Sequence, residues 1–364
     1  MKIAEVCPRY HPYIGGVETT VQEISERMVK LGHIVDVITT LGDKNLAKHE
    51  IINGVNTNRF NAFMLNDSYF ISPEMYFYLK SQNYDIIHAH SYNAFPAAMA
   101  ALAKKGATKF VFTSHYHPGG HTDFRTLLHV PYSFIGNYVF SKADQVLCDS
   151  EFEKRIVDQT FNVSRKSIML PIGINTKDFD KFKDSKKDKS RQSKVILCVG
   201  RLEEYKGIQN IIQCLPELSE ATLQVVGKGN YAIDLHDLAE SLRINQRIEW
   251  YSDLPRTQLV DMYADADVYV TLSSHEAYGI TVAEALLADT PCVVARGSAL
   301  EEFIDNKTCL GVDLPINKDE LISSIRKLYD EESRYQGKIY DWDEVTDRLL
   351  TIFSMVHHLP YPVA

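Results

Sequence analysis

The sequence predicts an α/β protein of two Rossmann-like, doubly wound domains in tandem. Short apolar runs alternate with helical periods along almost the whole chain, which is typical of parallel sheets with helices on both faces. A polar, highly charged segment at 179–194 interrupts this alternation. The 364 residues are enough for two domains with separate cores. We therefore expect two sheets with an interdomain cleft, because such sheets bind ligands beyond the carboxyl ends of their strands.

The first predicted domain covers residues 1–178. Its apolar runs, such as KIAEVC and YDIIHAH, have the length and composition of buried strands. Helical periods separate them, for example at 17–31 and 95–104. Strands are expected at 2–7, 33–39, 84–90, 109–115, 143–150 and 166–173.

After the segment 179–194, which is predicted to be a charged linker or surface loop, the alternation restarts. The second predicted domain covers 195–341. A last helical period at 342–356 could pack on either domain, and we treat 342–364 as a separate terminal segment. Strands are expected at 194–200, 221–227, 247–253, 266–273 and 290–295.

The composition is that of a globular, cytoplasmic protein, with 45% hydrophobic and 24% charged residues. No run approaches the ~18 apolar residues of a spanning helix. The first residues, MKIAEVCPRYHP, lack the apolar core of a signal peptide. The six cysteines are scattered without a C-x-x-C pair, which favours reduced, buried thiols over disulfides or zinc.

The net charge of −9 is unevenly distributed. Residues 1–176 carry 17 basic and 16 acidic side chains, whereas residues 195–364 carry 14 and 28. This balance argues against a general nucleic-acid binder, which needs a broad basic face. The near-neutral first half is the better side for a polar acceptor or a membrane surface.

Two glycine-containing loops follow the first strands of the two domains. Gly15 and Gly16 precede a predicted helix, where backbone can approach an anion, although the loop is not G-x-G-x-x-G and an ordinary turn is the alternative. In the second domain, Arg201 and Lys206 follow the strand KVILCVG. Two cations at a strand's carboxyl end suit a diphosphate, and the alternative is a solvated charged loop. In VVGKGN, which ends the following strand, Gly227 and Gly229 again leave backbone accessible.

The stretch SSHEAYGITVAEALLAD is the most specific motif. Gly279 permits a tight bend before a helix, whose first amides form an anion site. If a diphosphate were bound at this anion site, Glu276, before the bend, would face the group attached to the diphosphate. Glu284, on the helix, could bind a vicinal diol with both oxygens. A diphosphate flanked by two sugars would fit this arrangement.

No metal site is expected. His88 and His90 share one face of a strand, but no cysteine or carboxylate completes an obvious ligand set with them or with the histidines of HYHPGGH. His115, in the latter motif, is better placed as a polar group facing the cleft. We interpret the three D-x-D pairs as caps or surface charge: Asp178/Asp180, Asp265/Asp267 and Asp341/Asp343.

With E-A-Y-G-I-T-V-A-E and the E-x₇-E spacing of Glu276 and Glu284, the chain resembles the retaining glycosyltransferases of family 4, which have the GT-B architecture. The resemblance covers essentially the whole chain in order. It includes, besides that block, the segments GGVE, GHIVDVIT, DIIHAHS, TSHYH, DSEFEK, PIGIN, GRLEEYKG, VVGKGN and ADVYVTLSS.

The resemblance implies a role for each candidate residue. Glu284 would hold the ribose hydroxyls of the donor, and Glu276 would hold the transferred hexose. His115 would face the donor sugar near the reacting carbon. The terminal helix would cross back onto the first domain. The leaving diphosphate would be neutralised by Arg201, Lys206 and the amides around Tyr278, Gly279 and Ile280, while Gly15, Gly16, Gly227 and Gly229 would complete the donor site.

The sequence therefore predicts an enzyme, a retaining hexosyltransferase that uses a nucleotide-sugar donor, a glycan or lipid-linked acceptor, and no metal or other cofactor. The alternatives are a sugar-nucleotide epimerase, a phosphorylase, or a binding protein without turnover. Two departures from the family pattern concern the sugar rather than the reaction. Asp289 stands where glycine is common, and RGSALEEFI, with Glu301 and Glu302, replaces a Gly-Gly-x-Pro-Glu loop.

The segment 61–81 is rich in aromatic residues, including Tyr76, Phe77 and Tyr78. A core helix beside a partly covered loop is one explanation. The other is a surface that contacts a lipid-linked acceptor or the bilayer, which would place the protein peripherally at the inner face of the membrane.

Overall fold

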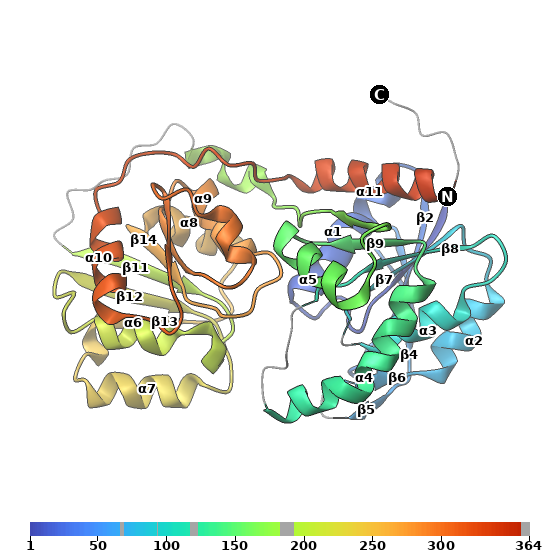
Figure 1. Cartoon of the computed structure of the whole chain (residues 1–364), viewed down its shortest axis with the longest axis horizontal. Helices are drawn as coiled ribbons and strands as arrows, with labels where there is room; N and C mark the ends of the chain where they lie inside the picture. Colours follow the sequence, from blue (N-terminus) through green and yellow to red (C-terminus); the bar gives the residue numbers. More distant parts are fainter. Residues whose placement is uncertain (66–68, 93, 117–122, 183–192, 358–364) are drawn as a thin grey trace. The chain divides into compact units, whose positions relative to one another are not determined.

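The computed structural model describes residues 1–65, 69–92, 94–116, 123–182 and 193–357. The chain divides into two compact units. The first domain comprises Met1–Gly173 and Tyr340–Ala364, and the second comprises Ile174–Ile339. Each is a predominantly parallel sheet with helices on its faces (Figure 1), which confirms the two predicted Rossmann-like domains.

The first sheet has the strand order β10-β9-β8-β7-β1-β2-β4-β3, in which only the β3–β4 pair is antiparallel. The strand order reverses between β1 and β7. The connection from β1 leads to one side of the sheet, to β2, and the connection from β7 leads to the other side, to β8. The strands are β1 (Lys2–Val6), β2 (Ile34–Thr40), β3 (His49–Ile52), β4 (Val55–Phe60), β7 (Ile86–His90), β8 (Lys109–Thr113), β9 (Gln145–Cys148) and β10 (Ser167–Met169). A separate hairpin is formed by β5 (Phe63–Leu65) and β6 (Tyr69–Ile71).

The helices of the first domain are α1 (Gly16–Lys30), α2 (Pro73–Ser81), α3 (Phe95–Ala103), α4 (Asp123–Lys142), α5 (Glu151–Phe161) and α11 (Trp342–His357). The terminal helix α11 packs against α1, so the chain returns to its first domain (Figure 1). Gly173 shows how closely it fits, because a Cβ there would meet the ring of Trp342 at 2.6 Å. Among the described residues, no helix is both long enough and apolar enough to span a bilayer.

Side chains of β1 and β7 alternate between the two faces of the first sheet. On one face, Val6 and Ala89 join the apolar core formed with α2, α3 and α4. On the other face lie the buried Glu5 and His88, and Phe353 of α11 packs edge-on against His88 with ring centroids 5.4 Å apart. The terminal helix thus covers a polar part of the sheet.

The second sheet has the order β13-β12-β11-β14-β15-β16 and is entirely parallel. Numbered from its own first strand, this is the order 3-2-1-4-5-6 of the dinucleotide-binding fold, which reverses between β11 and β14. The strands are β11 (Lys194–Val199), β12 (Ala221–Val226), β13 (Ile248–Tyr251), β14 (Val268–Thr271), β15 (Cys292–Ala295) and β16 (Cys309–Val312).

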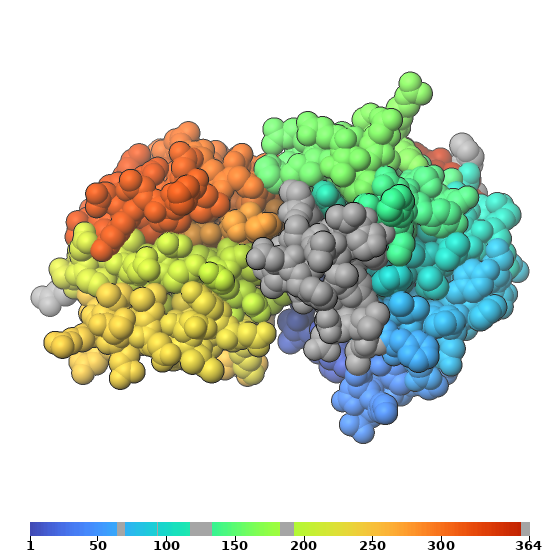
Figure 2. Space-filling model, turned by 60° about the horizontal axis from the view of Figure 1, so that its bottom comes forward, coloured from blue at the N-terminus to red at the C-terminus, as the bar shows by residue number. Residues whose placement is uncertain are grey.

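The α-helices of the second domain are α6 (Ile208–Cys214), α7 (Ala232–Ser241), α8 (Arg256–Asp265), α9 (Ile280–Leu287) and α10 (Lys318–Leu328). They enclose an aliphatic core that includes Leu223, Val270 and Ile325. Helix α7 (yellow in Figure 2) forms part of the outer surface. Four 3₁₀ segments join the described elements: η1 (Thr176–Phe182), η2 (Glu204–Lys206), η3 (Asn245–Arg247) and η4 (Ala299–Phe303).

The domain boundaries differ from those expected. The second unit begins at Ile174 rather than after residue 178, and the chain re-enters the first unit at Tyr340. The prediction of a linker was wrong for residues 179–182, which belong to η1. Phe179 is buried there, and the guanidinium of Arg256 lies 5.6 Å from its ring centroid. Apolar periodicity did not predict this packing because a single buried aromatic has no period. Residues 183–192 lie outside the described part of the chain.

Candidate functional site

The topology of the second sheet brings two of the predicted residues into contact. Lys206 lies in the connection after β11 and Glu276 in the connection after β14, and these adjacent strands flank the point where the strand order reverses. The Lys206 ammonium and the Glu276 carboxylate form an ion pair whose side chains are 16% and 24% exposed. The site therefore holds a cation and an anion side by side, beyond the carboxyl ends of the strands, where doubly wound domains bind ligands.

Tyr205 supports this pair, and sequence reasoning did not identify it. Arg201 donates a hydrogen bond from Nη2 to the Tyr205 hydroxyl (2.7 Å), and the Lys206 ammonium lies 5.2 Å from the ring centroid. The backbone N–H of Ser274 donates to the Tyr205 carbonyl (3.1 Å), which joins the two connections. A tyrosine in a charged loop gave no signal for this role, because the contact that joins the two connections is made with Ser274, which lies far along the chain.

The beginning of α9 has the expected geometry of an anion site. Gly279 adopts φ +116°, precedes the helix, and carries no side chain to cap the first-turn amides from Ile280 onward. The backbone conformation favours glycine, and a Cβ at Gly279 would meet Leu300 Cδ2 at 2.7 Å, so the Leu300 side chain would have to move. Tyr278 is buried, with its ring 5.5 Å from that of Phe303. The helix N-terminus is thus presented beside Glu276.

Glu284 is held by an arginine that the sequence analysis missed. Arg256, at the start of α8, forms ion pairs with Glu284 and, at 3.0 Å, with Asp178. Burial raises the pKa of Glu284, and the charge and hydrogen bond of Arg256 oppose that shift. The interpretation of Asp178 as a cap or surface charge was therefore incomplete, since this carboxylate orients Arg256. Asp267, by contrast, accepts a hydrogen bond from the Val195 N–H (2.8 Å) where the two central strands β11 and β14 begin.

Gly227 and Gly229 have a packing role that was not predicted. A Cβ at Gly227 would lie 1.8 Å from the Gly200 carbonyl oxygen, and one at Gly229 would lie 2.1 Å from the Leu202 carbonyl oxygen. The connections after β11 and β12 therefore approach each other more closely than any side chain allows. This contact explains both glycines without a ligand, although their backbone remains beside Arg201.

In the first domain, His115 follows β8 with φ +44°, an uncommon conformation for a residue with a side chain. Its Nδ1 lies 2.6 Å from Asp149 Oδ2 and its Nε2 lies 3.3 Å from His90 Nδ1. The side chain is only 10% exposed, so both ring nitrogens are engaged within the domain. Burial alone would lower the pKa of His115, but the nearby carboxylates, Asp149 foremost, outweigh it and raise the pKa.

The GGVE loop lies near this histidine. Gly15 precedes α1 in extended conformation, and a Cβ there would meet Glu18 Oε2 at 2.4 Å. A Cβ at Gly16 would meet nothing within 4 Å. The Glu18 carboxylate contributes to the raised pKa of His115. Glu18 follows β1 and His115 follows β8, and these strands of one sheet run parallel, so both residues come after the carboxyl ends of strands on the same side of the sheet. A side chain at the first position would displace the Glu18 carboxylate, whereas the second position leaves open space.

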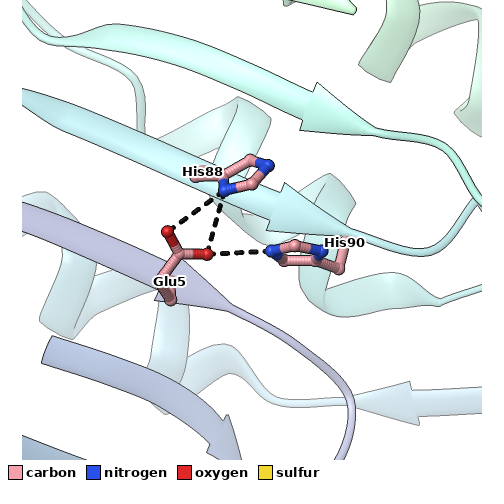
Figure 3. Close-up of side chains that lie close together, drawn as sticks. All are labelled: Glu5, His88 and His90. Atoms are coloured by element: carbon pink, nitrogen blue, oxygen red, sulfur yellow. Dashed lines mark hydrogen bonds and ion pairs between the residues drawn. The ribbon is translucent and has the colours of Figure 1, made fainter. Parts of the chain in front are cut away.

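The expectation that no carboxylate accompanies the HAH histidines was wrong. Glu5, on the neighbouring strand β1, contacts both rings (Figure 3). Register explains the contact, because Glu5 is directly paired with His88 and residues two apart on a strand share a face. Of the HYHPGGH histidines, His117 and His121 lie outside the described residues.

The remaining expectations have mixed outcomes. All six cysteines are free and buried, as predicted. Asp289 ends α9 with φ +57°, a conformation that aspartate tolerates, and pairs with Arg334 at 3.1 Å. Glu301 accepts a hydrogen bond from the Gly297 N–H and so braces its own loop.

Comparison with known families assigns both halves of the chain. The model described as Glycosyltransferase Family 4 matches residues 14–178, and the model described as Glycosyl transferases group 1 matches residues 179–340.

Three curated relatives span most or all of the chain. The chain is 25% identical to the phosphatidylinositol N-acetylglucosaminyltransferase GPI3 subunit of Saccharomyces cerevisiae, covering 97% of this chain and 83% of the relative. It is 27% identical to an uncharacterised glycosyltransferase of Methanocaldococcus jannaschii, covering 98% of each. It is 24% identical to the alpha-monoglucosyldiacylglycerol synthase of Streptococcus pneumoniae, covering 84% and 74%.

Solved structures share the fold. Sucrose-phosphate synthase from Thermosynechococcus elongatus superposes with a TM-score of 0.78 at 19% identity, covering 98% of this chain and 99% of that one. HepE of Anabaena in complex with UDP-glucose gives 0.76 at 18% identity, covering 98% and 100%. The two parallel sheets, the reversal of strand order that carries Lys206 and Glu276, and the two family matches lead to one assignment: the chain is a GT-B glycosyltransferase and belongs to the family-4 type.

Proposed function

We propose that the protein is a retaining hexosyltransferase that takes its sugar from a nucleotide-sugar donor. The observation that carries the proposal is the Lys206–Glu276 pair beside the uncapped start of α9. A donor must present a negative diphosphate next to a neutral, hydroxyl-rich sugar. The cation and the helix amides suit the former, and the carboxylate suits the latter as a hydrogen-bond acceptor.

The second acidic residue would bind the other end of the donor. Glu284 is 7% exposed and is fixed by Arg256, so its carboxylate has a defined direction. A carboxylate held in this way can accept hydrogen bonds from both hydroxyls of a ribose. HepE, which shares the fold, was crystallised with UDP-glucose, so a uridine diphosphate sugar is the first donor to test.

The chemistry would need no metal, because Arg201 and Lys206 supply positive charge where the departing diphosphate develops negative charge. The acceptor hydroxyl would attack from the face that the diphosphate leaves, and a departing phosphate oxygen would take its proton. This route retains the anomeric configuration. The sugar's anomeric bond to phosphate breaks as the new glycosidic bond forms.

A thermal-shift series with nucleotides and nucleotide sugars tests donor binding directly. A matching donor at 100 times its dissociation constant should stabilise the protein by roughly 2.7 kcal/mol. We expect a UDP-sugar to raise the melting temperature, and Glu284→Gln to reduce that increase, since glutamine has one acceptor oxygen where Glu284 has two, and Arg256 also donates to this group.

Two outcomes would contradict the proposal. If no nucleotide sugar raised the melting temperature, the donor site would not exist as described. If Glu284→Gln kept the full increase, Glu284 would not contact the ribose. Uridine alone serves as the control that separates base and ribose recognition from binding of the diphosphate.

We propose a lipid-linked acceptor, approached through the segment 61–81. Met75 and Leu79 of α2 are buried, so the core explanation holds for that side of the helix. Phe77 is nevertheless 68% exposed, and Phe63 of the β5–β6 hairpin is 74% exposed. Helix α2 lies at the surface of its domain (light blue in Figure 2). Two relatives are named for phosphatidylinositol and diacylglycerol acceptors, which supports a glycerolipid class.

Flotation with liposomes tests the membrane contact. The wild-type protein should float with anionic phospholipid vesicles, and Phe77→Asp should remain in the bottom fraction, because a charge cannot enter the acyl region without a large desolvation cost. Glu74→Asp, a substitution on the same helix that keeps the charge, is the control and should float like the wild type. Equal flotation of wild type and Phe77→Asp would remove this face from the proposal, as would no flotation of either.

A further inference from the structure

A continuous chain of hydrogen-bonded side chains runs from the core of the first domain to His115. His88 Nδ1 lies 3.1 Å from Glu5 Oε1 and 3.0 Å from Oε2, and His90 Nε2 lies 2.8 Å from Oε2 (Figure 3). His90 Nδ1 then contacts His115 Nε2 at 3.3 Å. The chain ends at Asp149, which is bonded to His115 Nδ1 at 2.6 Å.

The chain is closed to solvent along most of its length. Glu5, His88 and His90 are each at most 1% exposed. Phe353 of the terminal helix packs against the His88 ring on this side of the sheet. His88 is fixed at its far side by the Thr113 hydroxyl, 2.7 Å from Nε2. A proton inside this chain therefore exchanges with its neighbours in the chain rather than with bulk water.

With one proton on His90 and with Asp149 accepting from His115, two arrangements satisfy every contact. If Glu5 is a carboxylate, His90 donates from Nε2, so its Nδ1 is an acceptor and His115 must donate from Nε2. Since His115 also donates from Nδ1 to Asp149, it is then an imidazolium. If Glu5 is protonated, its hydroxyl donates to His90 Nε2, His90 donates from Nδ1, and His115 is neutral.

The two arrangements contain the same number of protons. They are interconverted when the Nε2 proton of His115 moves to His90 Nδ1 while the Nε2 proton of His90 moves to Glu5 Oε2. No bond to carbon changes, and no proton enters or leaves. Removing the shared proton altogether would leave His90 Nδ1 and His115 Nε2 facing each other with two lone pairs, which disfavours deprotonation.

We propose that Glu5 and His90 form a buried proton relay that stores one proton for His115. Glu5 and His90 are positioning residues, because they act on the reaction only through His115. His88 holds the first Glu5 oxygen and stays in one protonation state. The catalytic consequence rests on the proposed function and on the role beside the donor sugar that the resemblance implies for His115: the relay would place positive charge at His115 without drawing a proton from solvent.

The electrostatics of the surrounding groups agree with a shared proton. Burial lowers the pKa of both His88 and His90 to about 3, so neither carries a charge at neutral pH. Burial also raises the pKa of Glu5, against the hydrogen bond and charge of His90. A carboxyl group with a raised pKa is a suitable acceptor for a proton from a neighbouring imidazolium.

Other titratable groups also face the two ends of the relay. The groups that favour a cationic His115 come from three elements and are Asp149 after β9, Glu153 of α5 and Glu18 of α1. Burial, with Asp149, raises the pKa of Glu153 to about 8. Near Glu5 lie Cys7 and Tyr10, and burial raises the pKa of both, so they stay neutral.

The variant Glu5→Gln removes the proton transfer of the relay while keeping its hydrogen bonds. Its carbonyl can accept from His88 Nδ1 and its amide can donate to His90 Nε2, which imitates a permanently protonated Glu5. Every hydrogen bond remains, so the variant should fold with the stability of the wild type. It has no proton to return, so His115 should be neutral and His90 should carry its proton on Nδ1 only.

The test is side-chain ¹⁵N spectroscopy of the whole protein, labelled at histidine and free of ligand, at one neutral pH and several temperatures. Because the two arrangements hold the same number of protons, in the wild type we expect the fraction of His90 protonated on Nδ1 to equal the fraction of His115 that is neutral at every temperature. In Glu5→Gln both rings should show one fixed state. His90→Gln, which removes one ring, assigns the signals, and Glu26→Gln on α1 is the control carboxylate.

Identical protonation of His90 and His115 in the wild type and Glu5→Gln would overturn the relay. Stoichiometric zinc in the purified protein, with a chelator changing these signals, would also overturn it. Transfer assays give a second measurement: kcat of Glu5→Gln should fall by about tenfold or more with KM unchanged. If the spectra behave as expected but the wild type transfers no sugar, the relay stands and the proposed function fails.

Discussion

Replacing Glu276 by alanine should abolish sugar transfer while leaving the protein folded. We expect kcat/KM to fall by about 10³-fold, the order of loss seen when one positioned polar contact to a transition state is removed. The fold should survive because Glu276 and its partner Lys206 are both partly exposed. An ion pair of this kind contributes only about 0–1 kcal/mol to the free energy of unfolding.

The measurement is steady-state transfer from the donor found in the thermal-shift series, together with the melting temperature of each variant. Glu217→Ala is the matched control, because Glu217 forms an ion pair with Lys318 at the surface of the same domain. It should change neither quantity. Transfer by Glu276→Ala within about tenfold of the wild type would exclude Glu276 from the reaction, since a lost contact to the transferred sugar costs more than that.

Gly227→Ala should be the most destabilising of the substitutions considered. Gly227 has φ +157°, and a Cβ would lie 1.8 Å from the backbone oxygen of Gly200, which no side-chain rotation can relieve. Backbone strain of about 1–3 kcal/mol adds to an overpacking cost of about 1–3 kcal/mol. The second domain should therefore unfold at a clearly lower denaturant concentration.

Gly200→Ala separates the two causes. Gly200 has nearly the same backbone angle, φ +155°, but a Cβ there would meet nothing within 4 Å. Gly200→Ala should lower the free energy of unfolding only by the cost of backbone strain. Gly227→Ala should lower it further, by the cost of overpacking. Urea unfolding followed by circular dichroism measures the difference. Equal midpoints for the two variants would mean that the Gly200 carbonyl moves aside, and the packing explanation for Gly227 would be wrong.

Much of the fold could be predicted from the sequence because buried parallel strands form continuous apolar runs. KVILCVG and ADVYVTLS are examples, and both are strands in the structure. The short strands β3 and β4 were missed because HEII and VNTNRF mix polar with apolar residues. β3 is the edge strand and pairs only with β4, so its composition is weakly constrained.

The residues of the candidate site were also predicted only in part. Lys206, Gly279, Glu276 and Glu284 could be selected because each lies next to a predicted strand end or helix start. Arg256 could not, because it begins an ordinary helix and acts through Glu284, 28 residues further along. Glu5 could not either, since a single carboxylate in KIAEVC carries no sign of its partners on β7.

By itself, the sequence determined the alternation of strands and helices, the two Rossmann-like domains and the residues at the strand ends, because these depend on local composition and spacing. The tertiary structure decided which of those residues meet. Strand order places Lys206 against Glu276, and register places Glu5 against His88 and His90. The physical reason is that pairing between parallel strands joins segments tens of residues apart, and only the folded sheet specifies their neighbours and their register.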